Sequence, residues 1–221
     1  GSVRAGMAKI DSGLIEPLET IHIMGICGTA MGSLAGMLVD AGYRVTGSDT
    51  AAYPPMGDFL ATLGIEVMEG FNAENLDHNP DLVVVGNVVR AVYDEAEALV
   101  EKDLPYCSFP HLLGELVLNE ARSIVVAGTH GKTTTTAITT WLAQAANLEP
   151  GWLVGGVVLG LERSAHKGAG KLFIIEGDEY DTAFFDKRPK FLHYRANTAI
   201  LTSVEFDHAD IYRDLDHVKE S

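Results

Sequence analysis

Short apolar runs alternate with longer amphipathic stretches along most of this chain. Four runs predict strands in the first half: Thr20–Met24, Tyr43–Gly47, Ile65–Met68 and Leu82–Val85. Helices are expected between and after them, up to about Ala41 and near Met56–Leu63 and Val92–Lys102. Three more strands are predicted near Ser123–Ala127, Leu172–Glu176 and Ala199–Thr202. Strands that alternate with helices in this way are typical of an α/β fold with a mainly parallel sheet.

The order of these elements predicts two α/β units in tandem. We expect a Rossmann-like unit over residues 20–118 and a second unit over residues 119–221, with a linker near Leu118–Arg122. Residues 1–19, which begin GSVRAG, are interpreted as the remnant of a purification tag and a leader. The fold prediction therefore concerns residue 20 onward.

The stretch SIVVAGTHGKTTTT, Ser123–Thr136, predicts a phosphate-binding loop. A buried strand leads into the turn Gly128–Gly131, and a helix is expected to open at Lys132. N–H groups at a helix N-terminus point at an anion, and the helix dipole favours negative charge there. Lys132 would reach the β- and γ-phosphates, and the Thr133 hydroxyl would hold Mg²⁺. The loop is shorter than a full Walker A motif, so an ordinary turn with a solvated lysine is the alternative.

A second glycine loop, GICGTAMG at Gly25–Gly32, follows the first predicted strand and opens a helix. It departs from the GxGxxG dinucleotide fingerprint, because Cys27 and Ala30 stand where the second and third glycines should be. A pyrophosphate could still lie on its N–H groups. Asp49 ends the second strand, about where an acid binds a ribose hydroxyl. The alternative is a turn kept for strand–helix packing, with Asp49 an ordinary surface acid.

Acidic side chains follow two of the predicted strands in the second unit. Glu176 ends an apolar strand at the carboxyl edge of the sheet, where a carboxylate can hold Mg²⁺ directly or through water. Three neighbours are interpreted more readily as a solvated acidic loop: Asp178, Glu179 and Asp181. After Ala199–Thr202, His208 could ligate a second metal through a neutral ring nitrogen, or be a surface histidine. Near it, Asp207 is equally well explained as a helix N-cap.

Some residues carry weaker signals. Trp141 and Trp152 are interpreted as core residues on a helical or strand face. The spacing of His166 assigns it no role.

Composition limits the class of partner. The chain has 31 acidic and 16 basic residues, which gives a formal net charge of −15, and this charge disfavours nucleic acid and an anionic membrane surface. An anionic substrate must therefore be held locally. The two cysteines, Cys27 and Cys107, show no metal spacing and no disulfide framework, which suits a reducing cytoplasm. No apolar run approaches the length of a membrane span.

Taken together, these motifs resemble the ATP-dependent Mur ligases of bacterial cell-wall synthesis. The resemblance runs from His22 to about Val218, and GTHGKTTT at Gly128–Thr135 resembles the branch that uses UDP-N-acetylmuramate. Two further segments resemble the murein peptide ligases: EGDEYDTAFFDKRPKF at residues 176–191 and EFDHADIYRDL at residues 205–215. Ligases that add L-alanine usually carry a glycine where Cys27 stands, which favours the same branch.

The resemblance implies an activity, peptidoglycan recycling in the cytoplasm, and a set of sites. A carboxylate of UDP-N-acetylmuramate would take the γ-phosphate of ATP, and the amine of the murein tripeptide L-Ala-γ-D-Glu-meso-diaminopimelate would attack the resulting acyl phosphate. ATP would be bound by Gly128, Thr129, His130, Gly131, Lys132, Thr133 and Thr134. The catalytic residues would be Lys132, Glu176 and His208, with Mg²⁺ held by Thr133, Glu176 and His208. The UDP-sugar would be bound by Gly25, Cys27, Gly28, Thr29, Ala30, Met31, Asp49 and Asn87.

Several alternatives stay open at this point. Mur ligases have three domains, so the resemblance implies that this chain holds the first and part of a P-loop-type central ATPase domain, and that it is inactive alone. The other interpretations are a UDP-N-acetylmuramate–L-alanine ligase, a non-catalytic UDP-sugar-binding module, and an NAD-dependent oxidoreductase with a coincidental lysine loop. The sequence does not indicate an oligomeric state, and it does not prove which amine is accepted.

Overall fold

The structure is a computed structural model, and it describes residues 18–118, 120–156, 161, 163–177, 181–183, 186–189, 194 and 196–204. The chain divides into two compact units. Unit 1 consists of Gly1–Leu112 with Thr182–Lys187, and unit 2 of Leu113–Asp181 with Arg188–Ser221. The sequence-based boundary near Leu118 stays a prediction.

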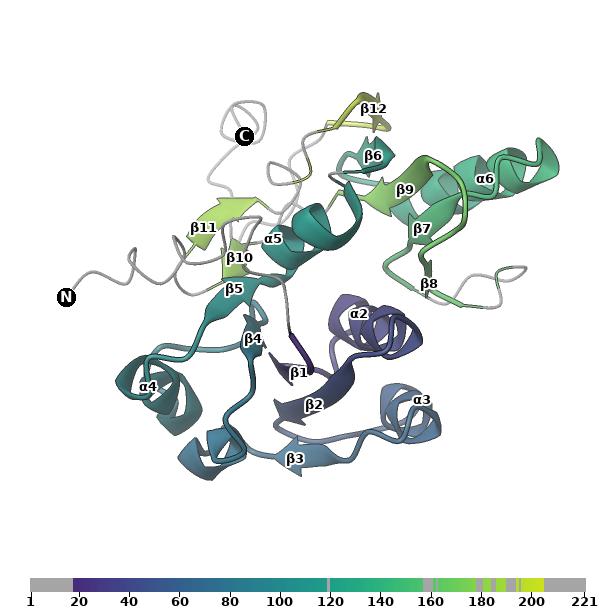
Figure 1. The fold of residues 1–221 in the computed structure, drawn as a ribbon. Coiled ribbons are helices and arrows are strands. Elements are labelled where there is room, and N and C mark those ends of the chain that lie inside the picture. The colour runs from purple at the N-terminus through teal and green to yellow at the C-terminus, as the bar shows by residue number, and fades with distance from the viewer. Residues whose placement is uncertain are drawn as a thin grey trace. The chain divides into compact units, whose positions relative to one another are not determined.

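Unit 1 is built on a five-stranded parallel sheet with the order β3-β2-β1-β4-β5 (Figure 1). Its strands are β1 (Thr20–Met24), β2 (Arg44–Asp49), β3 (Val67–Glu69), β4 (Leu82–Val85) and β5 (Tyr106–Ser108). Its helices are α2 (Thr29–Asp40), α3 (Met56–Thr62), the 3-10 helix η1 (Ala73–Leu76) and α4 (Asp94–Glu101). Because β1 pairs with β2 on one side and β4 on the other, the winding direction changes between β1 and β4. Open α/β sheets bind ligands outside the carboxyl ends of the strands at such a point.

The apolar runs of unit 1 become its core. All four residues of β4, LVVV, are buried, as expected for a parallel strand that is covered on both faces. Leu99 of α4 and Tyr106 of β5 pack in one cluster with Val83 and Val85. Burial of each large aliphatic side chain contributes about 1.5–3 kcal/mol, so these contacts fix where the loops after β1 and β4 lie.

A buried polar cluster links β1, β2 and α4 within this core. His22 Nε2 lies 2.7 Å from Glu95 Oε1, and both side chains are fully buried. Ser48 Oγ donates to the same carboxylate oxygen at 2.9 Å, and Asn75 Nδ2 donates to Glu95 Oε2 at 2.9 Å. The buried carboxylate therefore has partners on both oxygens, as a buried charge requires.

Unit 2 holds a second five-stranded sheet with the order β12-β6-β9-β7-β8. Its strands are β6 (Arg122–Ala127), β7 (Gly151–Leu153), β8 (Ala165–His166), β9 (Leu172–Glu176) and β12 (Thr198–Leu201). Only the β7–β8 pair is antiparallel among these strands. Its main helix is α6 (Lys132–Ala145). The π-helix η2 (Gly114–Leu118) also belongs to unit 2. The remaining described elements contain residues of both units: α5 (Phe109–Leu113), and a two-stranded sheet of β10 (Asp181–Ala183) and β11 (Asp186–Pro189).

The predicted α/β fold with mainly parallel sheets is confirmed. Every strand predicted from an apolar run is present, and most bounds shift by one or two residues at an end. The sequence pattern missed β5, β7, β8, β10 and β11, each of two to four residues. Runs that short do not show an alternation that can be told apart from a loop. Among the described residues, no helix combines the length and apolar character needed to cross a membrane.

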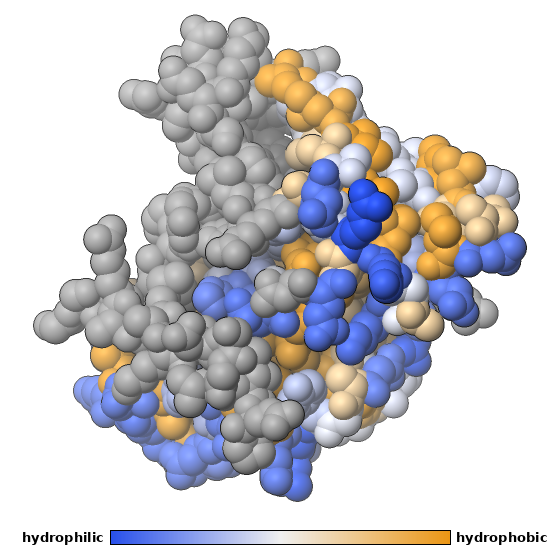
Figure 2. All heavy atoms as spheres, turned by 45° about the horizontal axis from the view of Figure 1, so that its top comes forward, coloured by the Kyte–Doolittle hydropathy of each residue, from blue (hydrophilic) through white to orange (hydrophobic). Residues whose placement is uncertain are grey.

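One core prediction is wrong. Trp152 is buried as expected, but Trp141 is 62% exposed, because it lies on the outer face of α6 beside Ile138 and Leu142. Figure 2 shows apolar residues gathered on the face of unit 2 where α6 and β12 lie. Amphipathic spacing alone does not say whether a helix face is covered.

Candidate functional site

The loop after β1 is hydrogen-bonded to the end of β2. The N–H groups of Gly25 and Ile26 both donate to the carbonyl oxygen of Ser48, at 2.8 and 3.1 Å. The N–H of Cys27 donates to Asp49 Oδ2 at 2.9 Å. Residue Gly28 then caps α2 without a side-chain hydrogen bond. The loop is therefore pinned on one side and carries the open N-terminus of a helix on the other.

The N-terminus of α2 presents the groups that the sequence predicted for an anion. Gly28 and Thr29 are exposed, Ala30 is partly buried, and Met31 is buried. The first N–H groups of a helix have no acceptor within it, so those of Thr29, Ala30 and Met31 are available to an anion. These residues lie together at the carboxyl end of β1, as predicted. Their role in binding the UDP-sugar stays a prediction.

Asp49 is not the ordinary surface acid that one interpretation of the sequence suggested. Its side chain is 9% exposed. One oxygen receives Cys27 N–H, and the other receives the N–H of Thr50 at 2.7 Å and its hydroxyl at 3.3 Å. Asp49 thus braces the glycine loop. Burial and the nearby Asp49 charge raise the pKa of the Cys27 thiol to about 11.

The loop after β4 lies against the same glycine loop. A Cβ placed on Gly25 would lie 3.0 Å from Val88 Cγ2. Val88 is 57% exposed, and Asn87 beside it is exposed as well. An amide and an apolar surface therefore flank the loop at the β1/β4 switch point. This places Asn87 in the neighbourhood that the sequence predicted.

The phosphate loop of unit 2 lies between β6 and α6, as predicted. Lys132 Nζ donates to the carbonyl oxygen of Gly128 at 2.7 Å and lies 3.5 Å from that of Thr129. The first intrahelical bond runs from Thr135 N–H to Gly131. The N–H groups of residues 131–134, at the helix N-terminus, thus have no acceptor within the helix. A cationic amine and a helix N-terminus meet at one place, which suits a polyphosphate.

Thr133 and Glu176 come together across two elements. Thr133 Oγ1 donates to Glu176 Oε1 at 2.9 Å, and Gly155 N–H donates to Glu176 Oε2 at 2.7 Å. Mg²⁺ binds oxygens at close to 2.1 Å with octahedral geometry, so two adjacent ligand oxygens lie about 2.9 Å apart. The 2.9 Å between Thr133 Oγ1 and Glu176 Oε1 is the length of a hydrogen bond, and a Mg²⁺ ion bound by both oxygens would replace that bond.

One predicted metal ligand, His208, lies outside the described residues. Two residues of the predicted solvated acidic loop, Asp178 and Glu179, lie outside them as well, and the side chain of Asp181 is not described. Within the described ranges, no three His, Cys, Asp or Glu side chains form a group that could hold a metal ion. His166 is exposed and lies with its ring 4.8 Å from that of Trp152.

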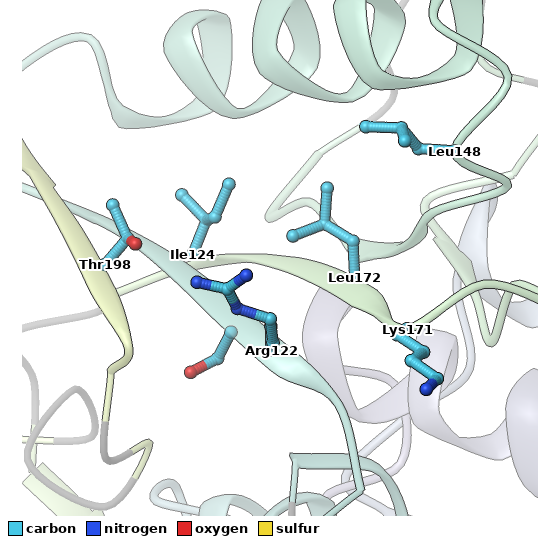
Figure 3. Close-up of a pocket in the computed structure, with 7 residues that line it drawn as sticks. Arg122, Ile124, Leu148, Lys171, Leu172 and Thr198 are labelled. Atoms are coloured by element: carbon cyan, nitrogen blue, oxygen red, sulfur yellow. The ribbon is translucent and has the colours of Figure 1, made fainter.

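A cavity of about 330 Å³ lies in unit 2, away from the phosphate loop. It is lined by residues at the amino ends of the strands, among them Arg122 of β6, Leu172 of β9 and Thr198 of β12 (Figure 3). Ile124, Leu172 and Leu148 form its apolar side, as the close-up shows. The phosphate loop follows the carboxyl end of β6, whereas this cavity lies at the amino ends of the strands. It is therefore not the nucleotide site.

Comparison with known proteins decides the family. A model of the Mur ligase family, catalytic domain, matches residues 20–120, and a model of the Mur ligase middle domain matches residues 126–221. The chain belongs to the Mur ligase family. The resemblance inferred from the motifs is therefore confirmed, and the Mur ligase fold accounts for both glycine loops.

Two curated Mur ligases illustrate the similarity. The chain is 48% identical over 200 residues to the UDP-N-acetylmuramate–L-alanyl-γ-D-glutamyl-meso-2,6-diaminoheptandioate ligase of Escherichia coli K12, covering 90% of this chain and 44% of that protein. It is 34% identical over 205 residues to the UDP-N-acetylmuramate–L-alanine ligase of Syntrophomonas wolfei, covering 93% of this chain and 42% of that protein. The chain thus spans less than half the length of either relative.

A solved Mur ligase structure agrees with this assignment. The crystal structure of the UDP-N-acetylmuramate:L-alanyl-γ-D-glutamyl-meso-diaminopimelate ligase from Neisseria meningitides matches with a TM-score of 0.87 and 47% identity. The match covers 92% of this chain and 66% of that chain.

Sequence reasoning missed three residues at the phosphate loop of this Mur ligase. Gly155 contacts Glu176, and Thr202 and Ser203 contact the loop itself. Gly155 belongs to a double glycine that follows β7, a strand too short to be predicted. Thr202 and Ser203 are ordinary residues in the sequence, and only the pairing of β12 with β6 brings them to the loop.

Proposed function

We propose that this chain is the UDP-sugar-binding and phosphate-loop part of an ATP-dependent ligase. The ligase joins UDP-N-acetylmuramate to the tripeptide L-Ala-γ-D-Glu-meso-diaminopimelate. The observation that carries the proposal is the contact of Thr133 with Glu176 beside Lys132, which combines a metal-type oxygen pair with a phosphate-binding amine. The choice of tripeptide rests on identity, which is 48% to a tripeptide ligase and 34% to an L-alanine ligase.

The reaction proceeds in two displacements. A carboxylate oxygen of the muramate attacks the γ-phosphorus of ATP, and the bond from that phosphorus to the ADP oxygen breaks, which gives an acyl phosphate and ADP. The tripeptide amine then attacks the acyl carbon, the bond to the phosphate oxygen breaks, and the amine loses a proton. The products are an amide and inorganic phosphate. Both steps depend on positioning and charge neutralisation more than on covalent work by the protein.

The residues of unit 2 divide this work. Lys132 and the N–H groups of residues 131–134 hold the β- and γ-phosphates, because the amine and the helix N-terminus both favour negative charge. Thr133 and Glu176 would supply oxygen ligands to Mg²⁺. When bound, Mg²⁺ supplies positive charge to the phosphate oxygens. Thr129 and His130 line the loop, and His208 holds a second metal ion in this proposal.

The residues of unit 1 bind the UDP-sugar. The N–H groups of Thr29, Ala30 and Met31 hold the diphosphate at the N-terminus of α2. Gly25, Cys27 and Gly28 shape the loop, and Asp49 and Asn87 flank it, with Asp49 also reaching the ribose. The reaction belongs in the cytoplasm, which agrees with two cysteines that form no disulfide with each other.

The test is phosphate release from ATP by a chain extended to the length of its relatives. UDP-N-acetylmuramate is supplied with either the tripeptide or L-alanine as amine donor. We expect Mg²⁺-dependent phosphate release and amide product with the tripeptide. Faster turnover with L-alanine would identify an L-alanine ligase instead. UDP-sugar binding without phosphate release with either donor would identify a non-catalytic module.

The Lys132→Ala variant checks the phosphate loop in the same assay. We expect turnover to fall by roughly 100-fold or more, because a phosphate-binding charge is lost from the transition state. Binding of the UDP-sugar should change little, since its loop belongs to unit 1. Near-normal ligation by this variant would remove Lys132 from the site.

A further inference from the structure

The exit of β12 is bonded to the phosphate loop by residues distant in sequence. Thr202 Oγ1 donates to the carbonyl oxygen of His130 at 2.5 Å, and Thr202 N–H donates to that of Ala127 at 3.0 Å. Ser203 Oγ accepts from His130 N–H at 3.1 Å, and the carbonyl oxygen of Ser203 accepts from Thr129 N–H at 3.0 Å. The main chain of residues 127–130 is therefore bonded to two consecutive residues that follow β12.

These bonds change how the short loop is organised. A Walker A loop of full length turns its N–H groups toward the phosphates. Here the N–H groups of Thr129 and His130 are directed to Ser203. The phosphate-facing N–H groups are thus those at the helix N-terminus, from residue 131 onward. The loop depends on the β12 exit for its shape.

Gly128 supports this interpretation. Its φ is +133°, and a Cβ at this position would overlap Thr202 Oγ1 and lie 2.9 Å from Ser203 N. The glycine therefore lets the β12 exit reach the loop. Its carbonyl oxygen is also the acceptor for Lys132 Nζ. One residue thus contacts the β12 exit and the phosphate-binding amine.

We propose that Thr202 and Ser203 are positioning residues of the phosphate loop. They hold the main chain of residues 128–130 so that Lys132 and the helix N-terminus keep the geometry that binds the β- and γ-phosphates. This inference rests on the proposed function, since it concerns the same ATP site. It gives the two residues that follow β12 a role in nucleotide binding. The residue types of Thr202 and Ser203 alone do not indicate this role.

The test compares Thr202→Val with Thr202→Ser in the extended ligase. Thr202→Val keeps the shape and removes the hydroxyl, and we expect the KM for ATP to rise about three- to tenfold. The KM for UDP-N-acetylmuramate should be unchanged. Thr202→Ser keeps the hydroxyl and should therefore keep the wild-type KM for ATP. Ser203→Ala removes the acceptor of His130 N–H and should behave like Thr202→Val, and it carries the test if Thr202→Val does not fold.

Thr198→Val is the matched control. Thr198 is an exposed threonine at the other end of β12, so its variant should keep the wild-type KM for ATP. If the extended ligase with the wild-type sequence releases no phosphate from ATP, the proposed function fails, and this inference fails with it. If that extended ligase is active and both Thr202→Val and Ser203→Ala keep its KM for ATP, the positioning role alone is overturned.

Discussion

At the scale of single residues, Cys27 and Asp49 show how a side chain can serve a loop through its neighbour. Asp49 accepts the N–H of Cys27 and places a negative charge near the thiol. Burial is the larger cause of the raised pKa of Cys27, and Asp49 adds to it. Burial alone raises the pKa of Cys107 to about 12. Both thiols should therefore react slowly in the folded chain, because the thiolate is the nucleophile.

The first prediction follows from that charge. Asp49→Asn removes a negative charge that disfavours the Cys27 thiolate, so the pKa of Cys27 should fall. Alkylation of Cys27 by iodoacetamide, followed by mass spectrometry between pH 7 and 10, should shift its profile to lower pH. At pH 8, where the wild-type thiol is almost wholly protonated, we expect alkylation to be several-fold faster in the variant.

Asp58→Asn, an exposed acid in the first turn of α3, is the matched control and should leave the profile in place. An unchanged profile would contradict the electrostatic link between Asp49 and Cys27.

At the scale of elements, α6 shows which of its threonines serve the helix and which serve the site. Thr136, Thr139 and Thr140 each donate a hydroxyl to the carbonyl four residues earlier, at 2.7, 2.7 and 2.9 Å. Such bonds satisfy the hydroxyls within a helix of otherwise modest propensity. Thr133 instead donates to Glu176 of β9. In the first turn of α6, the Thr133 hydroxyl thus bonds to the site, whereas the threonine hydroxyls of the later turns bond to the helix itself.

The second prediction concerns Gly155, the other partner of Glu176. A Cβ at Gly155 would lie 3.0 Å from Glu176 Oε2, so Gly155→Ala should displace the carboxylate from Thr133. In the extended ligase we expect the Mg²⁺ concentration for half-maximal rate to rise several-fold. Gly156→Ala is the control, because a Cβ there has nothing within 4 Å. Equal Mg²⁺ requirements for the two variants would show that Glu176 does not hold the metal ion.

The third prediction concerns the first turn of α4. Glu95→Ala leaves His22, Ser48 and Asn75 without their buried acceptor, and this should lower the free energy of unfolding by about 3–5 kcal/mol. Glu97→Ala removes an exposed acid from the same turn and should change the free energy of unfolding by less than about 0.5 kcal/mol. Urea unfolding of both variants is the measurement. Similar midpoints would mean that the buried pair contributes little.

At the scale of the whole molecule, the sequence predicts the architecture better than the contacts that shape the sites. Apolar runs such as Leu82–Val85 are long enough to define strands, and the glycine loops follow two such runs, so the sequence predicts where both loops lie. The orientation of Asp49 toward Cys27 was not predictable, because it depends on the register between β1 and β2. The contact of Ser203 with His130 depends in the same way on the pairing of β12 with β6. Contacts between distant segments need the folded sheet.

The negative net charge of the chain bears on how unit 1 would bind the proposed UDP-sugar. A net charge of −15 repels anionic ligands at long range, so the proposed UDP-sugar would have to be held by local groups. The N-terminus of α2 and the loop after β4 supply such groups within unit 1, and every contact described for them lies inside that unit. Unit 1 should therefore bind its ligand without any further segment.

The central claim is tested most directly by calorimetric titration of this 221-residue chain with UDP-N-acetylmuramate and, in parallel, with NAD. We predict detectable binding of the UDP-sugar and no heat of binding with NAD. ATP should bind weakly, and no amide product should form when the tripeptide is added. Binding of NAD without binding of the UDP-sugar would contradict the assignment of the first glycine loop, and with it the account of this chain as part of a ligase.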